Sequence, residues 1–183
     1  CLAGGVALNS VANKKLIDNS NFKNIFVFPA CSDAGISFGA TLWGAFNLIK
    51  DIKRSSLSFD NAYTGKEYTN KQVLDLFKKF KIKYSKKNNY KIAKYIADKK
   101  IVGRCSGRSE YGPRALGNRS ILADARSKKM RDYLNLRVKH REVFRPFAPV
   151  VLEENNKEYF DLKQSSPFML LVAKSFKPSL IPS

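Results

Sequence analysis

The sequence has a single histidine, His140, and only three cysteines, Cys1, Cys31 and Cys105. One histidine excludes a metal site built from several histidines of this chain alone. The cysteines are far apart and odd in number, so they predict neither a disulfide framework nor a CxxC metal knuckle. We therefore expect the reducing cytoplasm as the compartment.

Long apolar runs are also missing. None approaches the roughly 18 residues that a membrane span needs, and no basic-then-apolar leader opens the chain. The sequence therefore predicts no membrane partner. The chain begins with Cys1 instead of Met and ends at Ser183 soon after an apolar run, so we expect both ends to be cut from a longer protein.

Acidic residues are scarce. The 183 residues include 15 Asp and Glu against 34 Lys and Arg, which gives a formal net charge of +19. Hydrophobic residues make up 44%, so a packed core is expected in spite of this charge. An excess of positive charge favours an anionic partner, either nucleic acid, a phosphate-bearing small molecule or an acidic surface. The charge alone does not choose among them.

The positive charge is of two kinds. Residues 1–100 hold 17 Lys and one Arg, whereas nine of the ten Arg lie between Arg104 and Arg145. Scattered lysines are typical of a solvated surface. Arginine offers a planar fork that binds phosphate or carboxylate with two hydrogen bonds. The arginine block therefore predicts a site for an anion.

The hydrophobic pattern predicts an α/β fold. Apolar spacing favours helices over 6–16 and 34–49, with a short buried strand over 25–28 between them. The polar, aperiodic stretch 50–66 predicts a domain boundary. Beyond it we expect helices 71–80, 90–99 and 127–138, the first two capped by Asn70 and Asn89, and strands 101–105, 120–123, 147–152 and 168–172.

Two short motifs precede the boundary. Gly4-Gly5 lies at a predicted strand–helix turn, where the backbone can approach a phosphate, and Asn9 can hydrogen-bond a nucleoside. The alternative is an ordinary turn. Asp33 precedes a glycine-containing helix, where it can ligate a metal, orient a substrate or simply cap the helix.

The segment Gly107 to Ser120 interleaves glycines with Arg108, Arg114 and Arg119. It lacks the GxxxxGK[ST] order of a P-loop. Glycines allow a tight loop and arginines neutralise an anion, so the segment predicts an anion-binding loop. The alternative is a structural network in which Glu110 pairs with these arginines.

A second basic element follows the last predicted helix of the arginine block. If Lys139-His140-Arg141 is extended, Lys139 and Arg141 project to one face, which suits a phosphate, and His140 points to the other. Arg145 follows closely. A structural role is expected for His140.

These segments together resemble the NodU/CmcH-type O-carbamoyltransferases. The resemblance covers nearly the whole chain and is carried by residues 2–9, 32–35, 107–124, 139–142 and 144–149. It implies that residues 1–50 are the end of an ASKHA-like domain and residues 51–64 a linker. Residues 65–183 would form a truncated YrdC-like domain with a twisted mixed sheet.

The resemblance also implies a reaction in two steps. The YrdC-like domain hydrolyses carbamoyl phosphate and joins the carbamate to the α-phosphate of ATP, with Mg²⁺ expected beside the nucleotide. The ASKHA-like domain then transfers the carbamoyl group to an acceptor hydroxyl and releases AMP. Small-molecule substrates are thus the implied partners, in place of nucleic acid.

Roles for single residues follow from the same resemblance. Lys139 and Arg141 match a KxR element that holds phosphate. The matching anion loop contains Arg108, Arg114, Arg119 and Ser120, and Arg145 is grouped with the nucleotide-binding residues. Gly4, Gly5 and Asn9 match the nucleotide-binding turn of the ASKHA-like half. Asp33 matches a ligand of iron or another divalent metal.

The chain departs from the family pattern at both ends. The histidines expected in the first half of the ASKHA-like domain and the late Ser-x-Asn element are absent. We therefore expect the isolated chain to be inactive in transfer. Two alternatives stay open: a basic RNA-binding module, and a nucleotide-binding protein without transfer chemistry. Few aromatic side chains interleave with the arginines, which counts against stacking on bases.

Overall fold

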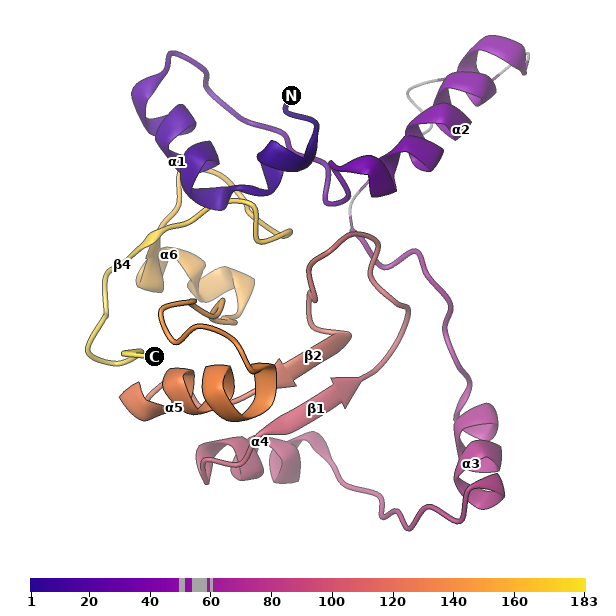
Figure 1. Cartoon of the computed structure of the whole chain (residues 1–183), viewed down its shortest axis with the longest axis vertical. Helices are drawn as coiled ribbons and strands as arrows, with labels where there is room; N and C mark the ends of the chain where they lie inside the picture. Colours follow the sequence, from indigo (N-terminus) through magenta and orange to yellow (C-terminus); the bar gives the residue numbers. More distant parts are fainter. Residues whose placement is uncertain (50–51, 54–58, 60) are drawn as a thin grey trace. The chain divides into compact units, whose positions relative to one another are not determined.

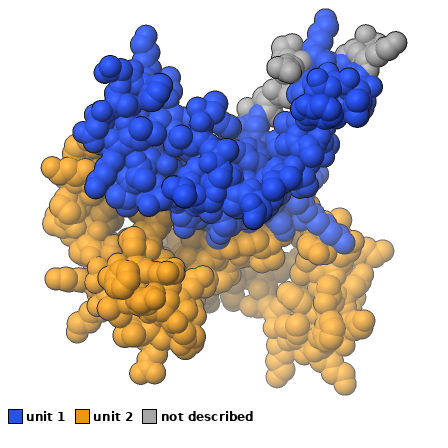
Figure 2. All heavy atoms as spheres, turned by 45° about the horizontal axis from the view of Figure 1, so that its top comes forward, with its two compact units in different colours: residues 1–66, 108–116, 163–173 blue, residues 67–107, 117–162, 174–183 orange. Residues whose placement is uncertain are grey.

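The structure is a computed structural model that describes residues 1–49, 52–53, 59 and 61–183. These residues form two compact units, and each unit is built from three separate segments of the chain (Figure 2). Unit 1 comprises residues 1–66, 108–116 and 163–173, and unit 2 comprises residues 67–107, 117–162 and 174–183. The chain therefore leaves unit 2 and returns to it twice.

The predicted linker 51–64 lies partly outside the described residues, at 51, 54–58 and 60. The predicted domain boundaries stay a prediction. Among the helices of the described ranges, none is long and apolar enough to cross a membrane.

The described residues combine helices with short antiparallel strands, which confirms the predicted α/β class in its broad sense. The expected larger mixed sheet is absent from the described part of the chain. In its place are two antiparallel pairs: β1 (Val102–Cys105) pairs with β2 (Arg119–Leu122), and β3 (Phe160–Asp161) pairs with β4 (Lys174–Ser175). The ASKHA-like and YrdC-like assignments stay predictions.

Three predicted strands did not form, each for a different reason. In segment 25–28, Val27 forms an isolated parallel bridge with Leu2, and the backbone N–H and carbonyl of Ile25 are hydrogen-bonded to the amide side chain of Gln164. In segment 147–152, Pro149 lacks the backbone N–H that a ladder requires. In segment 168–172, Met169 has a φ of 52°, which interrupts an extended backbone.

Unit 1 carries the amino-terminal helices. They are the 3₁₀ turn η1 (Gly5–Leu8), α1 (Ser10–Asn19), the 3₁₀ turn η2 (Asp33–Gly35) and α2 (Ile36–Leu48). The predicted helix over 6–16 is thus divided into η1 and α1. The division falls at Asn9, whose side-chain oxygen accepts the Ala12 N–H at 3.1 Å and caps α1.

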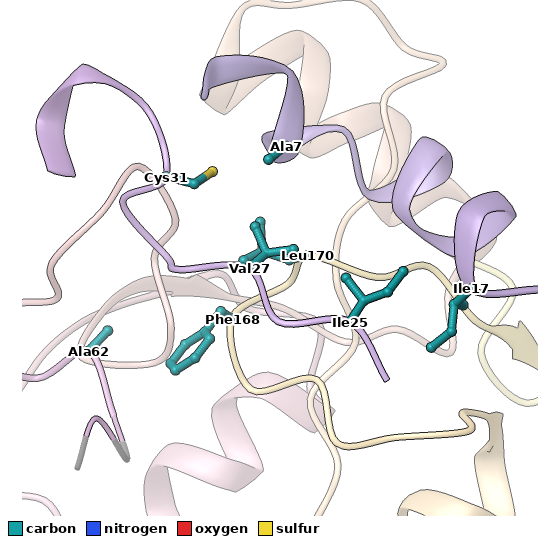
Figure 3. Packing of buried hydrophobic residues seen from close by; sticks show 8 residues of the cluster. All are labelled: Ala7, Ile17, Ile25, Val27, Cys31, Ala62, Phe168 and Leu170. Carbon is teal, nitrogen blue, oxygen red and sulfur yellow. The ribbon is translucent and has the colours of Figure 1, made fainter. Parts of the chain in front are cut away.

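A cluster of buried apolar side chains holds unit 1 together (Figure 3). Its members come from two of the three segments of unit 1, residues 1–66 and 163–173. They are Ala7, Ile17, Ile25, Val27, Cys31, Ala62, Phe168 and Leu170. Segment 108–116 joins the unit through Tyr111, whose ring lies edge-on to Phe28 at 5.8 Å. Removing such side chains from water is the main stabilising contribution to unit 1.

Unit 1 also buries one amide side chain, that of Asn13, which is 3% exposed. Its Nδ2 donates to the carbonyl oxygens of Ala7 at 2.8 Å and Leu170 at 2.9 Å. The amide therefore ties the start of the chain to the segment 163–173.

Unit 2 contains the remaining elements of the chain. They are α3 (Asn70–Lys79), α4 (Asn89–Ala97), β1 (Val102–Cys105), β2 (Arg119–Leu122), α5 (Lys128–Tyr133), the π-helical segment η4 (Leu134–Lys139), the 3₁₀ turn η5 (Glu153–Asn155), α6 (Asn156–Tyr159), β3 (Phe160–Asp161) and β4 (Lys174–Ser175). Figure 1 shows β1 and β2 side by side, with their ends joined by the loop 106–118.

The caps predicted for the first two helices of unit 2 were each wrong by one residue. Thr69 caps α3 and forms a reciprocal capping box with Gln72, and Asn88 accepts the Lys91 N–H at the start of α4. In both cases the preceding residue can place its side-chain oxygen over the free N–H groups, so the helix starts one position earlier.

Candidate functional site

The glycine turn at the start of unit 1 has an open surface. Gly4 adopts a φ of 88° and its N–H donates to the Cys31 carbonyl oxygen at 2.6 Å. A Cβ atom added at Gly4 or Gly5 would meet no atom within 4 Å. The turn thus leaves room for a ligand against the backbone. The oxygen of Asn9, by contrast, is already engaged as the cap of α1.

Arg114 reaches the last residue of η1 from a distant part of the sequence. Its Nη2 donates to the carbonyl oxygen of Leu8 at 3.1 Å, within unit 1. Its Nε is buried and has no hydrogen-bond partner among the described residues. A buried donor without a partner costs free energy, and an acceptor oxygen from an anionic ligand would remove that cost.

The loop that carries Arg114 is anchored by backbone contacts. Glu110 accepts the Leu116 N–H at 3.1 Å and so closes the loop on itself. Arg108 donates to the carbonyl oxygen of Gly65 at 3.5 Å, and Gly65 N–H donates to Ser109. Part of this network is therefore structural. The alternative interpretation, in which Glu110 pairs with the arginines of the loop, stays a prediction.

Asp33 is the first residue of η2 and is exposed. In this position its carboxylate favours the positive end of the following helical turns. No group of three or more His, Cys, Asp or Glu that could hold a metal occurs within residues 1–49, 52–53, 59 and 61–183. The residues present therefore do not hold a metal by themselves, and Asp33 offers one ligand at most.

Arg119 and Ser120 lie on β2 in unit 2 and their hydrogen bonds close the hairpin. The Arg119 guanidinium donates to the carbonyl oxygens of Ser106 at 2.8 Å and Gly107 at 3.1 Å. Ser120 Oγ accepts the Gly117 N–H at 2.9 Å. These two predicted site residues thus hold both sides of the loop 106–118 at its base.

The predicted extended conformation of Lys139-His140-Arg141 is wrong. Lys139 is the last residue of η4, and His140 takes a left-handed conformation, with φ 48° and ψ 52°. Arg141 therefore starts a new direction and does not share a strand face with Lys139. The physical reason lies in Asn135, whose backbone oxygen accepts the Arg141 N–H at 3.0 Å and ends the helix.

Arg141 and Arg145 are both held by neighbours. The guanidinium carbon of Arg141 lies 4.7 Å from the centre of the Phe147 ring, and its Nε donates to Asn135 Oδ1 at 2.7 Å. Arg145 forms an exposed ion pair with Glu142 at 3.1 Å. The side chain of Asn135 itself is completely buried. Sequence reasoning missed Asn135, because nothing in the surrounding residues distinguishes it from an exposed helical asparagine.

A second polar feature of unit 2 was also missed. Asp124 is 7% exposed and accepts two hydrogen bonds from the Arg126 guanidinium, each at 2.8 Å. This contact holds the pKa of Asp124 below its ordinary value and raises that of Arg126. The pair borders a hollow of about 350 Å³ that is also lined by Ala97, Lys99 and Ser127. None of the predicted site residues lines this hollow.

The predicted site residues are divided between the units. Unit 1 holds Gly4, Gly5, Asn9, Asp33, Arg108 and Arg114. Unit 2 holds Arg119, Ser120, Lys139, Arg141 and Arg145. Within unit 1 the structure brings Arg114 to the loop between η1 and α1, and within unit 2 it gathers Arg141 and Arg145 around Asn135.

Comparisons with known proteins match both parts of the chain. Residues 1–42 match the model of the carbamoyltransferase N-terminus, and residues 93–180 match that of the carbamoyltransferase C-terminus. Segment 108–116 thus has a C-terminal family match although it lies in unit 1.

Relatives extend along almost the whole chain. An uncharacterised protein of Synechocystis is 43% identical over 94% of this chain and 29% of its own length. The nodulation protein NolO of Bradyrhizobium diazoefficiens is 41% identical over 95% of this chain and 33% of its own length. Nodulation protein U of Rhizobium fredii is 35% identical over 93% of this chain and 28% of its own length. The chain spans about three tenths of the length of these relatives. With both family models matched, it belongs to the carbamoyltransferase family, as the sequence motifs predicted.

Proposed function

We propose that the complete protein is an ATP-dependent O-carbamoyltransferase that makes and consumes carbamoyladenylate. In the first step water releases phosphate from carbamoyl phosphate, and a carbamate oxygen then attacks the α-phosphorus of ATP while pyrophosphate leaves. In the second step an acceptor hydroxyl attacks the carbamoyl carbon, AMP leaves, and the hydroxyl proton passes to a base. The substrates are small molecules, and the acceptor carries a hydroxyl group.

One observation carries the proposal. Arg114 belongs to the segment matched by the C-terminal family model, yet its guanidinium contacts Leu8, which belongs to the segment matched by the N-terminal model. The buried Nε of Arg114 lacks a partner among the described residues. A cation at the end of the 3₁₀ turn η1, which begins at Gly5, is suited to a phosphate or to the charge of a carbamoyladenylate.

The chemistry requires cations close to the reacting groups. Carbamate and ATP repel each other, and fixed guanidinium groups offset this repulsion and stabilise the charge that builds on the α-phosphate. We assign Arg108, Arg114 and Arg141, with Lys139, to this role. Arg119 and Ser120 hold the base of the loop, and Arg145 adds positive charge. Mg²⁺ is expected with ATP.

The remaining roles concern the transfer step. Gly4 and Gly5 leave room for a nucleotide at the turn, and Asn9 shapes it by capping α1. Asp33 is proposed as a single ligand of a divalent metal in the complete domain. Such a metal would polarise the carbamoyl group and the acceptor oxygen.

The test is pyrophosphate release from ATP by the full-length protein with and without carbamoyl phosphate. We expect release that depends on carbamoyl phosphate, and Arg114→Ala is expected to lower kcat/KM about 100- to 1,000-fold, as for loss of a positioned donor. Arg131→Ala, which removes a surface arginine paired with Asp132, is the matched control and is expected to leave the rate unchanged.

Two results would contradict the proposal. The first is pyrophosphate release that ignores carbamoyl phosphate. The second is salt-sensitive RNA binding that survives loss of Lys139 and Arg141, since that would favour the RNA-binding alternative.

A further inference from the structure

Asn135 is the most deeply buried polar side chain in the described part of unit 2. It is polar, it lies on η4, and its exposed fraction is 0%. A buried amide is tolerated only when its donors and acceptors are paired. The partners of Asn135 therefore explain why the chain keeps a polar group there.

All of these partners lie in the segment that follows η4. Asn135 Nδ2 donates to the carbonyl oxygens of Val143 at 3.2 Å and Arg145 at 2.9 Å. Its Oδ1 accepts Arg141 Nε at 2.7 Å, and its backbone oxygen accepts the Arg141 N–H at 3.0 Å. One residue thus fixes the backbone of residues 141–145 and also the side chain of Arg141.

These contacts leave the outer part of Arg141 available. Its Nε is bonded to Asn135, and one face of the guanidinium lies over Phe147. Among the described residues, no hydrogen bond to its two terminal nitrogens is recorded. A guanidinium whose Nε is held and whose two Nη atoms remain available binds phosphate with less loss of side-chain entropy than a mobile guanidinium.

We propose that Asn135 is a positioning residue that orients Arg141 to bind an anionic substrate, a phosphate or an acyl phosphate. The inference rests on the proposed function, because it takes Arg141 as a ligand of that substrate. Asn135 acts through Arg141 and does not itself touch the substrate.

Asn13 in unit 1 provides a matched comparison. It is also a buried asparagine whose Nδ2 donates to two carbonyl oxygens. No charged side chain is bonded to it among the described residues. Replacing Asn13 or Asn135 by Ala removes the same chemical group, but only the second change releases an arginine.

The experiment is a double-mutant cycle in the full-length protein, with the KM for carbamoyl phosphate and kcat measured for each variant. We expect Asn135→Ala to lower kcat/KM about 10- to 100-fold, since a misplacement of a binding group by about 1 Å can lower the rate by about 100-fold. In an Arg141→Ala background the same substitution is expected to have little further effect. Asn13→Ala combined with Arg141→Ala is expected to be additive.

The outcomes separate this inference from the proposed function. If Arg141→Ala alone leaves kcat/KM unchanged, the assignment of Arg141 in the proposed function fails, and the role of Asn135 fails with it. If Arg141→Ala lowers kcat/KM but Asn135→Ala does not, or if their effects add, only the positioning role is overturned.

A measurement on the unaltered protein covers the case in which Asn135→Ala does not fold. The Nε–H of Arg141, observed by ¹⁵N NMR, is expected to exchange with water about tenfold more slowly than the Nε–H of the exposed Arg137. Equal exchange rates would overturn the proposal, because they would mean that Asn135 does not hold the Arg141 side chain.

Discussion

The eight residues of the hydrophobic cluster all belong to unit 1, whereas two of the most deeply buried side chains of unit 2, Asn135 and Asp124, are polar. Unit 1 is thus closed by apolar side chains from segments far apart in the sequence. In the described ranges of unit 2 the buried apolar side chains are Met130 and Leu134, and hydrogen bonds and ion pairs make up much of the remaining contacts.

This difference affects how each unit responds to change. Apolar burial is non-directional and depends on area. Truncating a buried apolar side chain therefore lowers the free energy of unfolding roughly in proportion to the apolar group removed. A single hydrogen bond contributes less to stability, but it fixes the orientation of the groups that it joins. If one partner is removed, the other is left buried without a hydrogen bond, which lowers the free energy of unfolding. The predictions below test this contrast, from the largest expected effect to the smallest.

Phe168→Ala is expected to be the most destabilising change, because Phe168 is 9% exposed and belongs to the cluster of unit 1. Loss of a buried aromatic side chain costs about 3–5 kcal/mol in the free energy of unfolding, measured by urea denaturation. Phe144→Ala in unit 2 is the control, since Phe144 is 76% exposed and its truncation is expected to cost under about 0.5 kcal/mol. Equal costs would remove the contrast between the units.

Gly112→Ala tests how segment 108–116 is fitted into unit 1. A Cβ there would lie 2.8 Å from the Pro29 carbonyl oxygen, and Gly112 has a φ of +117°. Gly117 in unit 2 has a similar φ of +112° but open space around it. We expect Gly112→Ala to cost about 1–3 kcal/mol more than Gly117→Ala. Equal losses in urea denaturation would mean that the contact with Pro29 does not constrain the loop.

Asp124→Asn tests the ion pair of unit 2 through pH. Arg126 lowers the folded-state pKa of Asp124 below its ordinary 3.8, so the charge contributes stability at neutral pH. With Arg126 largely exposed, we expect a loss of about 1–2 kcal/mol at pH 7. The Tm difference between the two proteins is expected to shrink as the pH falls below 3.8 and to vanish below the lowered pKa. A difference independent of pH would contradict the role of the charge.

Glu142→Gln is expected to have the smallest effect. The Glu142–Arg145 pair is more than half exposed on both sides, so its loss costs under about 1 kcal/mol and less at high salt. Urea denaturation at low and high ionic strength measures this. A cost above that of Asp124→Asn would show that exposed charges, and not the buried polar groups, stabilise unit 2.

The sequence predicted the α/β class and most helices, because apolar periodicity and capping residues are local signals. It also predicted β1 and β2 within one residue of their ends. It failed where a hydrogen bond that no local pattern predicts decides the backbone. The side chain of Gln164 pairs with both backbone groups of Ile25 in place of a strand, and the backbone oxygen of Asn135 accepts the Arg141 N–H and ends the helix.

The candidate site follows the same pattern. The sequence identified the arginine loop as a candidate anion-binding loop from its residue types, but it did not predict the hydrogen-bond partners of those residues. Arg119 and Ser120 lie in the same motif as Arg114, yet they close the hairpin, while Arg114 contacts Leu8 at a separation of 106 residues. No local rule predicts a contact between positions so far apart.

The bond between Asn13 and Leu170 joins residues 157 positions apart. Ribosomes add about 5–20 residues per second, so Asn13 waits roughly 8–30 s for this partner to be synthesised. During that interval the cluster lacks Phe168 and Leu170, and the nascent chain presents an unfinished apolar surface. Unit 1 is therefore completed only near the end of translation of this segment, and a chaperone that shields apolar surface would have most to offer before that point.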